Sequence, residues 1–221
     1  SSPQLTARLL ADRAVAVPGE TVTLAFVQEI APDWHTYWRN PGDSGAPAEL
    51  AWELPAGATL GPLEWPAPEA IPYFGLMTYG HHGRFVLLQT LTLPADWPAG
   101  TPFPVRLAAD WLVCAEICIP ESGIFALELA TGGGAAPAGP AILEAIETAR
   151  AALPRPSPWP AVFASDAATL RLVIGLEAGL TGLVDARFFP LTQGLIDQVA
   201  APVWRLAAEG LVLDLPLAWP A

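Results

Sequence analysis

Proline and glycine are the residues that most constrain how this chain can fold. Twenty-five prolines and nineteen glycines are spread through the 221 residues, and because both break helices, long helices are excluded over most of the sequence. The runs between them are short, and their apolar residues recur at every second position. In segment 21–30, for example, Val22, Leu24 and Phe26 fall on one face of a strand. The sequence therefore predicts an all-β protein.

Eight segments with strand character precede residue 131, and turn signals separate them. They are 4–12, 21–30, 34–39, 48–53, 58–65, 84–93, 103–112 and 123–130. Many short strands joined by turns are typical of an antiparallel β-sandwich. Hydrophobic residues make up 52% of the chain, which is enough to fill the core of such a sandwich.

The character of the sequence changes after residue 131, which predicts a first β domain over residues 1–131. Residues 132–160 are rich in Gly, Ala and Pro, and segment 141–153 within them has apolar residues at helical spacing. We expect a linker that contains one helix.

Strand patterns resume in residues 161–221, which are predicted to form a second, smaller β module. The predicted strands are 169–176, 183–190, 201–207 and 211–218. Because four strands are few for a closed sandwich, we expect this module to be cut short or to lean on the first domain.

The charge of the chain excludes some classes of partner. Ten arginines and no lysines accompany 22 acidic residues, which gives a net charge of −12 at pH 7. Binding to nucleic acid requires clustered cations, and no such cluster occurs. No apolar run approaches the ~20 residues that span a bilayer, and the first ten residues lack the pattern of a signal peptide. These features fit a cytosolic protein or the mature form of an exported one.

The only two cysteines, Cys114 and Cys118, lie four positions apart in the stretch WLVCAEICIP. On one continuous strand they would be about 13 Å apart, beyond the ~7 Å Cα separation that a disulfide allows. A disulfide therefore requires a tight turn at 115–117, at the mouth of a hairpin. So small a ring stabilises a fold by only ~2 kcal/mol on the entropy model, against ~4.7 kcal/mol for a 100-residue loop.

Four interpretations of the cysteine pair follow from this spacing. A redox disulfide is slightly favoured, because strained and exposed disulfides are the labile ones, and a structural disulfide comes next. A metal site is a third, since His81 and His82 could complete four ligands, although adjacent residues on a strand point to opposite faces. Inert buried thiols are the fourth, and the spacing alone leaves all of them open.

Two segments are unusually rich in aromatic residues. In the first, Trp34 and Trp38 alternate on one face, and we expect them to pack in the core. In the second, Tyr73 and Phe74 fall in a predicted loop, where a large apolar pair is out of place unless it covers something. The histidines that follow, His81 and His82, are expected in a polar turn.

The sequence resembles a family of bacterial envelope proteins. The segments that carry the resemblance are WHTYWRNPGDSG, WELPAG, WPAPE, YFGLMTYG, LVCAEICIP and, after residue 160, FFPLTQGLID. They span most of the chain and are similar to the N-terminal periplasmic region of DsbD-like transmembrane thiol–disulfide reductases. Three residues separate the cysteines here, where the DsbD motif has five. That spacing matches the ScsB branch, named for suppression of copper sensitivity.

The resemblance implies an immunoglobulin-like sandwich that relays electrons in the bacterial periplasm without a cofactor or a metal. Cys114 and Cys118 would be the redox pair, and Cys118 would bond with partners. Tyr73, Phe74 and Gly75 match a cap loop over the disulfide, and His35 and Tyr37 match the strand beside it.

The resemblance also implies the partners of this relay. Electrons would come from a thioredoxin-like domain of the same polypeptide, whose remaining part is embedded in the membrane, and would pass to periplasmic thioredoxin-fold proteins. No nucleic acid would be involved. The rival hypothesis is a non-catalytic immunoglobulin-like binding module with a structural disulfide, which holds copper through its Cys and His side chains.

Within the pair, the sequence also predicts which sulfur is accessible. Pro120 turns the chain away from regular pairing soon after Cys118, whereas Cys114 follows the apolar run Trp111–Leu112–Val113. We therefore expect the sulfur of Cys118 to lie nearer the surface than that of Cys114.

Overall fold

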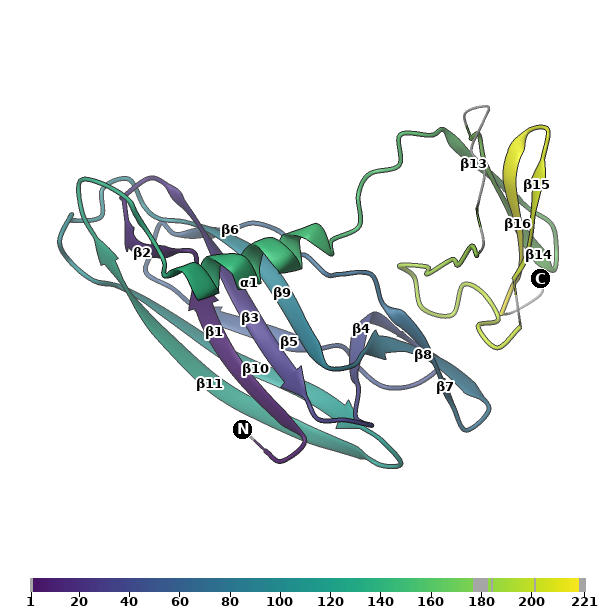
Figure 1. Ribbon diagram of the computed structural model, residues 1–221, viewed down its shortest axis with the longest axis horizontal. Coiled ribbons are helices and arrows are strands. Elements are labelled where there is room, and N and C mark those ends of the chain that lie inside the picture. Colours follow the sequence, from purple (N-terminus) through teal and green to yellow (C-terminus); the bar gives the residue numbers. More distant parts are fainter. Residues whose placement is uncertain (1, 177–182, 184, 201, 219–221) are drawn as a thin grey trace. The chain divides into compact units, whose positions relative to one another are not determined.

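The structure is a computed structural model that describes residues 2–176, 183, 185–200 and 202–218 (Figure 1). Within these residues it is a mostly β protein with one helix, α1 (Pro140–Ala151). The strands are β1 (Leu5–Ala11), β2 (Arg13–Ala16), β3 (Thr21–Ile30), β4 (Thr36–Gly42), β5 (Glu49–Glu53), β6 (Thr59–Leu60), β7 (Glu69–Tyr73), β8 (Leu76–His81), β9 (Arg84–Thr92), β10 (Phe103–Cys114), β11 (Cys118–Thr131), β12 (Ala136–Pro137), β13 (Ala161–Ser165), β14 (Thr169–Ile174), β15 (Val203–Ala207) and β16 (Gly210–Pro216).

The chain divides into two compact units, each built from several segments. The first unit comprises Ser1–Trp38, Ala46–Ala67 and His81–Pro154, and the second comprises Arg39–Gly45, Pro68–Gly80 and Arg155–Ala221. A division of the sequence into consecutive ranges does not describe this pattern. The boundaries predicted after residues 131 and 160 stay a prediction about how the chain is organised.

The first unit is a sandwich of two sheets. One sheet has the strand order β1-β3-β9-β6, and the other has the order β12-β2-β11-β10-β5. Most pairings are antiparallel, and the short pairing of β11 with β2 is parallel. The predicted class of an antiparallel, immunoglobulin-like β-sandwich is confirmed.

The sandwich core follows from the period-two pattern of the strands. Val22, Leu24 and Phe26 of β3 are all at most 2% exposed and face the interior, as their alternation predicts. On the opposite sheet, β10 contributes Phe103, Val105, Leu107, Ala109, Trp111 and Val113 to the same core. This alternation fixes the register of β10, and therefore the position at which the strand delivers Cys114.

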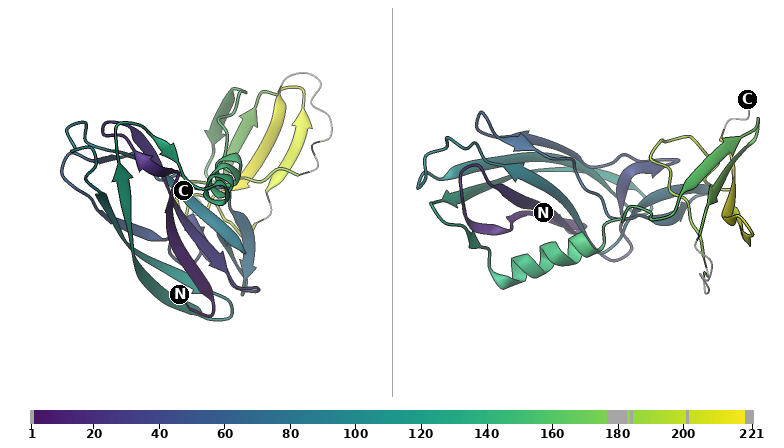
Figure 2. Two further views of the ribbon diagram at one scale, coloured as in Figure 1. Left: turned by 60° about the vertical axis from the view of Figure 1, so that its left-hand side comes forward. Right: turned by 90° about the horizontal axis from the view of Figure 1, so that it is seen from above.

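Helix α1 covers the outer face of the sheet that contains β3. Ile146 and Ala149 pack against Ala25, Val27 and Leu88, the residues of β3 and β9 that alternate with those of the sandwich core. Figure 2 shows the helix lying on the outside of this layer. The predicted helix is confirmed, and the sheet is buried on both faces.

The segment that precedes the helix is also tied to the first unit. Within the predicted linker, β12 pairs with β2, and the amide of Ala138 donates a 2.9 Å hydrogen bond to the carbonyl of Asp12. Residues 132–160 therefore contain both a short strand and a packed helix.

The second unit contains a four-stranded antiparallel sheet with the order β13-β14-β16-β15. Its core gathers Ile196, Leu211, Leu213 and Leu215. Strand β13, which the sequence did not predict, is exposed along its whole length. The strand predicted at 183–190 is wrong for its described residues, because they form no ladder. The side chain of Phe188 packs against the sheet from an irregular segment.

A smaller sheet, with the order β4-β8-β7, is formed mainly by residues of the second unit. Asn40 of β4 donates a 2.7 Å hydrogen bond to the carbonyl of Pro190, and Tyr79 of β8 packs edge-on against Phe189, with ring centroids 5.0 Å apart. No helix in the described part of the chain is both long and apolar enough to cross a membrane.

Candidate redox site

The two cysteines close the hairpin formed by β10 and β11. Cys114 is the last residue of β10 and pairs in register with Cys118, the first residue of β11. The chain reverses through residues 115–117, where the amide of Ala115 donates a 3.0 Å hydrogen bond to the carbonyl of Ile117. The sulfurs are bonded at 2.09 Å, and the Cα atoms are 4.1 Å apart. The predicted tight turn is confirmed, and the cysteines are not free thiols.

The two sulfurs of this disulfide occupy different environments. Cys114 is fully buried at 0% exposure, because a third segment of backbone pairs with it. The amide of Cys114 donates to the carbonyl of His35, and the amide of His35 donates to the carbonyl of Cys114, both at 2.9 Å. Cys118 is exposed. The prediction that Cys118 lies nearer the surface is confirmed.

Tyr37 brings a hydroxyl group to the disulfide. Its ring is 2% exposed, and its Oη lies 3.1 Å from Sγ of Cys114 and 3.3 Å from Sγ of Cys118. A disulfide sulfur has no proton to donate, so the tyrosine O–H is the donor in either contact. The site therefore holds one hydrogen-bond donor within reach of both sulfurs.

His35 lies between this tyrosine and a second histidine. Its ring is edge-on to that of Tyr37 at a centroid distance of 5.3 Å, and it lies 5.7 Å from the ring of His82. Burial lowers the pKa of His35 from 6.5 to about 4, with a further contribution from the neighbouring charge of His82. His35 is therefore neutral at physiological pH, so the ring that packs against Tyr37 carries no charge.

His81 differs from its sequence-based prediction. It ends strand β8 rather than lying in a polar turn, is 7% exposed, and stacks on Phe85 with centroids 4.1 Å apart. Burial, followed by the charge of His82, lowers the pKa of His81 to about 4. The run of two histidines suggested a polar turn, but His81 is the last of four consecutive buried residues in β8. The expectation of core packing holds for Trp38 at 5% exposure, and Trp34 packs at the edge of the core.

The described residues contain no group of three or more His, Cys, Asp or Glu side chains arranged to hold a metal ion. The set considered from the sequence included both cysteines, and their sulfurs are bonded to each other. A disulfide offers no thiolate, which is the form in which cysteine binds zinc or copper.

The predicted cap residues lie at the tip of the β7–β8 hairpin. Tyr73 pairs with Leu76, so Phe74 and Gly75 form a two-residue turn. Both have positive φ, 48° for Phe74 and 84° for Gly75, as a type I′ turn requires. Phe74 is 80% exposed and contacts Tyr73 edge-on, with centroids 4.9 Å apart. This tip belongs to the second compact unit.

An exposed phenylalanine at positive φ is unusual for two reasons. A residue with a Cβ pays roughly 1–2 kcal/mol in the left-handed region, and a large apolar side chain in water gains no burial in return. Such outliers gather at functional positions. The sequence signal for this site was the aromatic pair beside a glycine; the two strands that flank it were missed because Pro72 lies in the first of them.

Comparison with known proteins agrees with this arrangement. The family model described as "Thiol:disulfide interchange protein DsbD, N-terminal" matches residues 6–130. The N-terminal periplasmic domain of ScsB from Proteus mirabilis superposes with a TM-score of 0.72 at 21% identity, over 97% of this chain and 80% of that one.

A second solved structure is a more distant comparison. The N-terminal domain of DsbD from Neisseria meningitidis in the reduced form matches 59% of this chain and 90% of that one, at 22% identity and a TM-score of 0.28. No curated protein matches the chain.

The matched region contains the strands of both sandwich sheets except the short β12, together with the cysteine pair and Tyr37. The chain therefore belongs to the family of DsbD N-terminal domains. The match to the ScsB periplasmic domain covers 97% of this chain, so the similarity of fold includes most of residues 161–221 as well.

Proposed function

We propose that this protein is an electron relay of the bacterial envelope that works by thiol–disulfide exchange at Cys114 and Cys118. It takes electrons from a thioredoxin-like domain of the same polypeptide, whose remainder is membrane-embedded, and passes them to periplasmic thioredoxin-fold proteins. Membership of the DsbD family supports the chemistry. The observation that carries the proposal is the asymmetry of the disulfide, with Cys118 exposed and Cys114 at 0% exposure.

This asymmetry determines which of the two sulfurs reacts with a partner. A thiolate of the electron donor attacks Sγ of Cys118, the sulfur it can reach, and a mixed disulfide forms. The bond between Cys118 and Cys114 breaks, and its electron pair leaves on Sγ of Cys114. The second thiolate of the donor then attacks the other donor sulfur, the one that is bonded to Cys118 in the mixed disulfide. Cys118 is released as a thiolate, the donor is left oxidised, and the relay has gained two electrons.

The second half of the cycle runs through the same atoms in reverse. The thiolate of Cys118 attacks the disulfide of the downstream partner, and one partner sulfur leaves as a thiolate. Cys114 then attacks Cys118, so that the relay disulfide re-forms and the partner is released as a dithiol. The chain itself requires no cofactor for these steps, because thiolates and disulfides carry both electrons.

Tyr37 is placed to assist the leaving sulfur. A thiolate at Cys114 would be buried, and an unpaired buried charge is costly. The O–H of Tyr37, 3.1 Å from that sulfur, would donate to it and stabilise the charge. The same hydroxyl lies 3.3 Å from the sulfur of Cys118, so it can donate a hydrogen bond to whichever of the two sulfurs carries the negative charge. His35 would position this tyrosine through ring packing and its two backbone bonds to Cys114.

Tyr73, Phe74 and Gly75 are proposed to form a cap that shields the disulfide from stray thiols. The support is the exposed Phe74 at positive φ, which a purely structural turn would not retain. The envelope is oxidising and rich in thiol-reactive partners, so a relay that reacts only after its cap is displaced would keep its electrons for the correct acceptor.

The decisive experiment traps the mixed disulfide. Cys114→Ser removes the resolving sulfur, so a partner bonded to Cys118 cannot be released and should accumulate on non-reducing gels. Cys118→Ser should trap nothing. Trapped species found only with Cys118→Ser would reverse the two roles, and none with either variant would contradict exchange altogether. The reduction potential should also lie above the roughly −300 mV that marks resistant structural disulfides.

A further inference from the structure

The face of the first unit that carries Cys118 continues along β11 into an acidic hollow. Alternate residues of a strand share a face, so Cys118, Pro120, Ser122 and Ile124 point the same way, and all four are exposed. Ile124 is 66% exposed, and Ile117, beside the disulfide, is 65% exposed. This face, named here the Cys118 face, is therefore an open surface that begins at the reactive sulfur.

The hollow beside this face has a volume of about 350 Å³. Its carboxylates are Glu49, Asp110 and Glu121, and none of its lining residues is basic. Asp110 pairs in register with both Glu49 and Ser122, so Asp110 and Glu49 lie on the face of the sheet that carries Cys118. Glu121, opposite Trp111, alternates to the other face and lines the hollow from there.

The carboxylates of the hollow have no cation of their own. In the described part of the chain, the ion pairs involve other residues, and none includes Glu49, Asp110 or Glu121. One oxygen of Glu121 is buried and has no hydrogen-bond partner. No ion pair among the residues that the structure describes therefore neutralises this charge.

The hollow is close enough to Cys118 to act on a group that reacts there. Glu121 lies three residues along β11 from Cys118, about 10 Å, and Ser122, opposite Asp110, lies four residues away, about 13 Å. The Debye length is ~10 Å at 0.1 M ionic strength and ~30 Å at 0.01 M. A charged group of a partner docked at Cys118 would therefore interact with these carboxylates.

We propose that the Cys118 face is the docking surface for the thioredoxin-fold partner, and that the acidic hollow receives Lys or Arg side chains that the partner carries about 10 Å from its reactive cysteine. This inference rests on the proposed exchange at Cys118 and adds the chemistry by which the partner is recognised. Ile117 and Ile124 supply apolar contact area, and the hollow attracts cationic partners and repels acidic ones.

The field at Cys118 can be measured with charged small thiols. The disulfide would be reduced by cysteamine, a cation, and by 2-mercaptoethanesulfonate, an anion, with alkylation and mass analysis as the readout. The ratio of the two rates, relative to the same ratio in a variant, cancels the intrinsic difference between the thiols. At 0.01 M ionic strength, a carboxylate about 13 Å away should change this ratio about two-fold.

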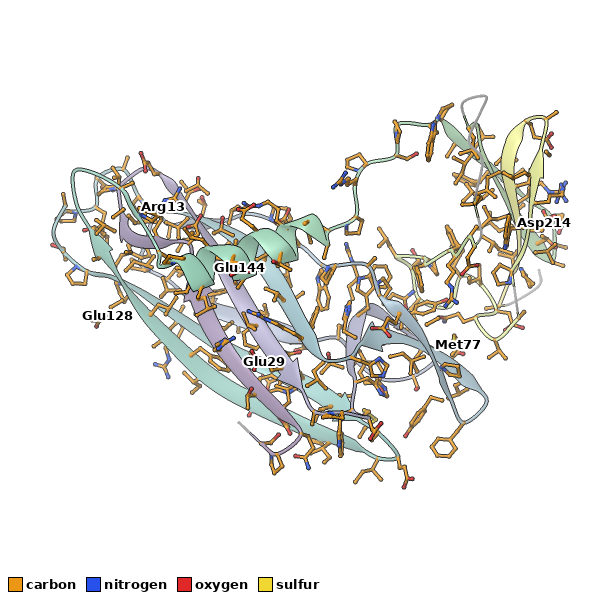
Figure 3. All side chains as sticks on the ribbon, viewed as in Figure 1. Arg13, Glu29, Met77, Glu128, Glu144 and Asp214 are labelled. Carbon is orange, nitrogen blue, oxygen red and sulfur yellow. A yellow bond between two sulfur atoms is a disulfide. The ribbon has the colours of Figure 1, made fainter. Side chains whose placement is uncertain are left out.

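The test variant is Glu49→Gln/Asp110→Asn, in which both side chains are exposed and the volume is conserved. Its cation-to-anion ratio should fall about three-fold at 0.01 M ionic strength, because Glu49 lies one strand further from Cys118 than Asp110 does. The matched control is Glu128→Gln, ten residues along β11 and about 33 Å from Cys118, labelled in Figure 3. It removes one charge from the face of β11 that carries Cys118 and should change the ratio by less than about 1.2-fold.

A second measurement tests docking at the stated distance. Two reduced Cys-Gly-Pro-Cys peptides, followed by three Lys or by three Glu, should reduce the relay at different rates, with the Lys peptide faster. The Glu49→Gln/Asp110→Asn variant should remove most of that preference, and Glu128→Gln should preserve it.

Each failure has its own signature. An unchanged thiol ratio in the double variant, or an equal fall in the control, would overturn the acidic hollow as a recognition site even where Cys114→Ser traps a partner. Absence of any trapped partner would instead contradict the proposed relay, whatever the thiol ratios show.

Discussion

The two buried histidines should make the protein lose stability in mildly acidic solution. His35 and His81 are 3% and 7% exposed, and each has its pKa lowered by burial from 6.5 to about 4. In the unfolded chain both would titrate near 6.5. Between these values the unfolded state binds more protons than the folded state, so stability falls as the pH falls.

The magnitude follows from the width of that window. One pKa unit corresponds to ~1.36 kcal/mol. A pH of 5 lies about 1.5 units below the pKa of a histidine in the unfolded chain, whereas the folded histidine is still mostly neutral at that pH. Each histidine should therefore remove about 2 kcal/mol from the free energy of unfolding between pH 7.5 and pH 5, and the two together about 4 kcal/mol. The loss should continue until the folded histidines titrate near pH 4.

Urea unfolding of the disulfide-bonded protein at pH 7.5, 6.0 and 5.0 would measure this loss. His81→Phe keeps an aromatic ring against Phe85 and removes one titrating group, so the loss over this range should halve. Because the readout is the slope with pH, any packing cost of the substitution cancels. A loss below about 1 kcal/mol in the parent protein, or an undiminished loss in His81→Phe, would refute the buried neutral state of these side chains.

Two further predictions concern the disulfide and its tyrosine. Cys114→Ser/Cys118→Ser should unfold with a free energy about 2 kcal/mol lower, because only a five-residue ring is opened; a variant that cannot fold, by circular dichroism, would make the disulfide structural. Tyr37→Phe should slow reduction by dithiothreitol roughly ten-fold or more, because a hydrogen bond to a charged group contributes about 1.5–3 kcal/mol. An unchanged stopped-flow rate for Tyr37→Phe would remove this hydroxyl from the mechanism.

The geometry of the disulfide was predictable because local rules determine it. The extended spacing of four residues is too long for a disulfide, so the chain between Cys114 and Cys118 had to reverse if the two sulfurs were to bond. The apolar run that precedes Cys114 agrees with the burial of that residue. The argument from Pro120 was wrong, because Pro120 does not interrupt the pairing and lies in register opposite Leu112. What these rules omit is the third segment of backbone, at His35, that pairs with Cys114 and completes its burial. That contact joins residues 79 positions apart and has no local sequence signal.

Other errors arose where tertiary contacts override a local pattern. Pro72 argued against a strand, yet β7 accommodates it in the edge strand of a small sheet, a position that tolerates proline. The apolar segment around Phe188 suggested a strand, but its side chains pack against the second sheet from an irregular backbone. Conversely, β13 is too exposed on both faces to show the alternation by which strands are recognised.

Phe74 offers a prediction that separates folding from function at one position. Its φ of 48° is one that asparagine adopts far more readily, and Asn-Gly is the preferred pair for a type I′ turn. Because the ring is 80% exposed, Phe74→Asn loses little burial and should raise the free energy of unfolding by about 1 kcal/mol.

If the ring is kept to shield the disulfide, the same substitution should speed reduction by dithiothreitol, since access to the sulfur is one of the factors that set the exchange rate. Thermal unfolding and reduction kinetics on one protein sample would give both quantities, with Leu76→Thr as the control on the same hairpin. A more stable variant with unchanged reduction kinetics would contradict the cap. A variant that is less stable would show instead that the ring is held by contacts that its exposure does not reveal.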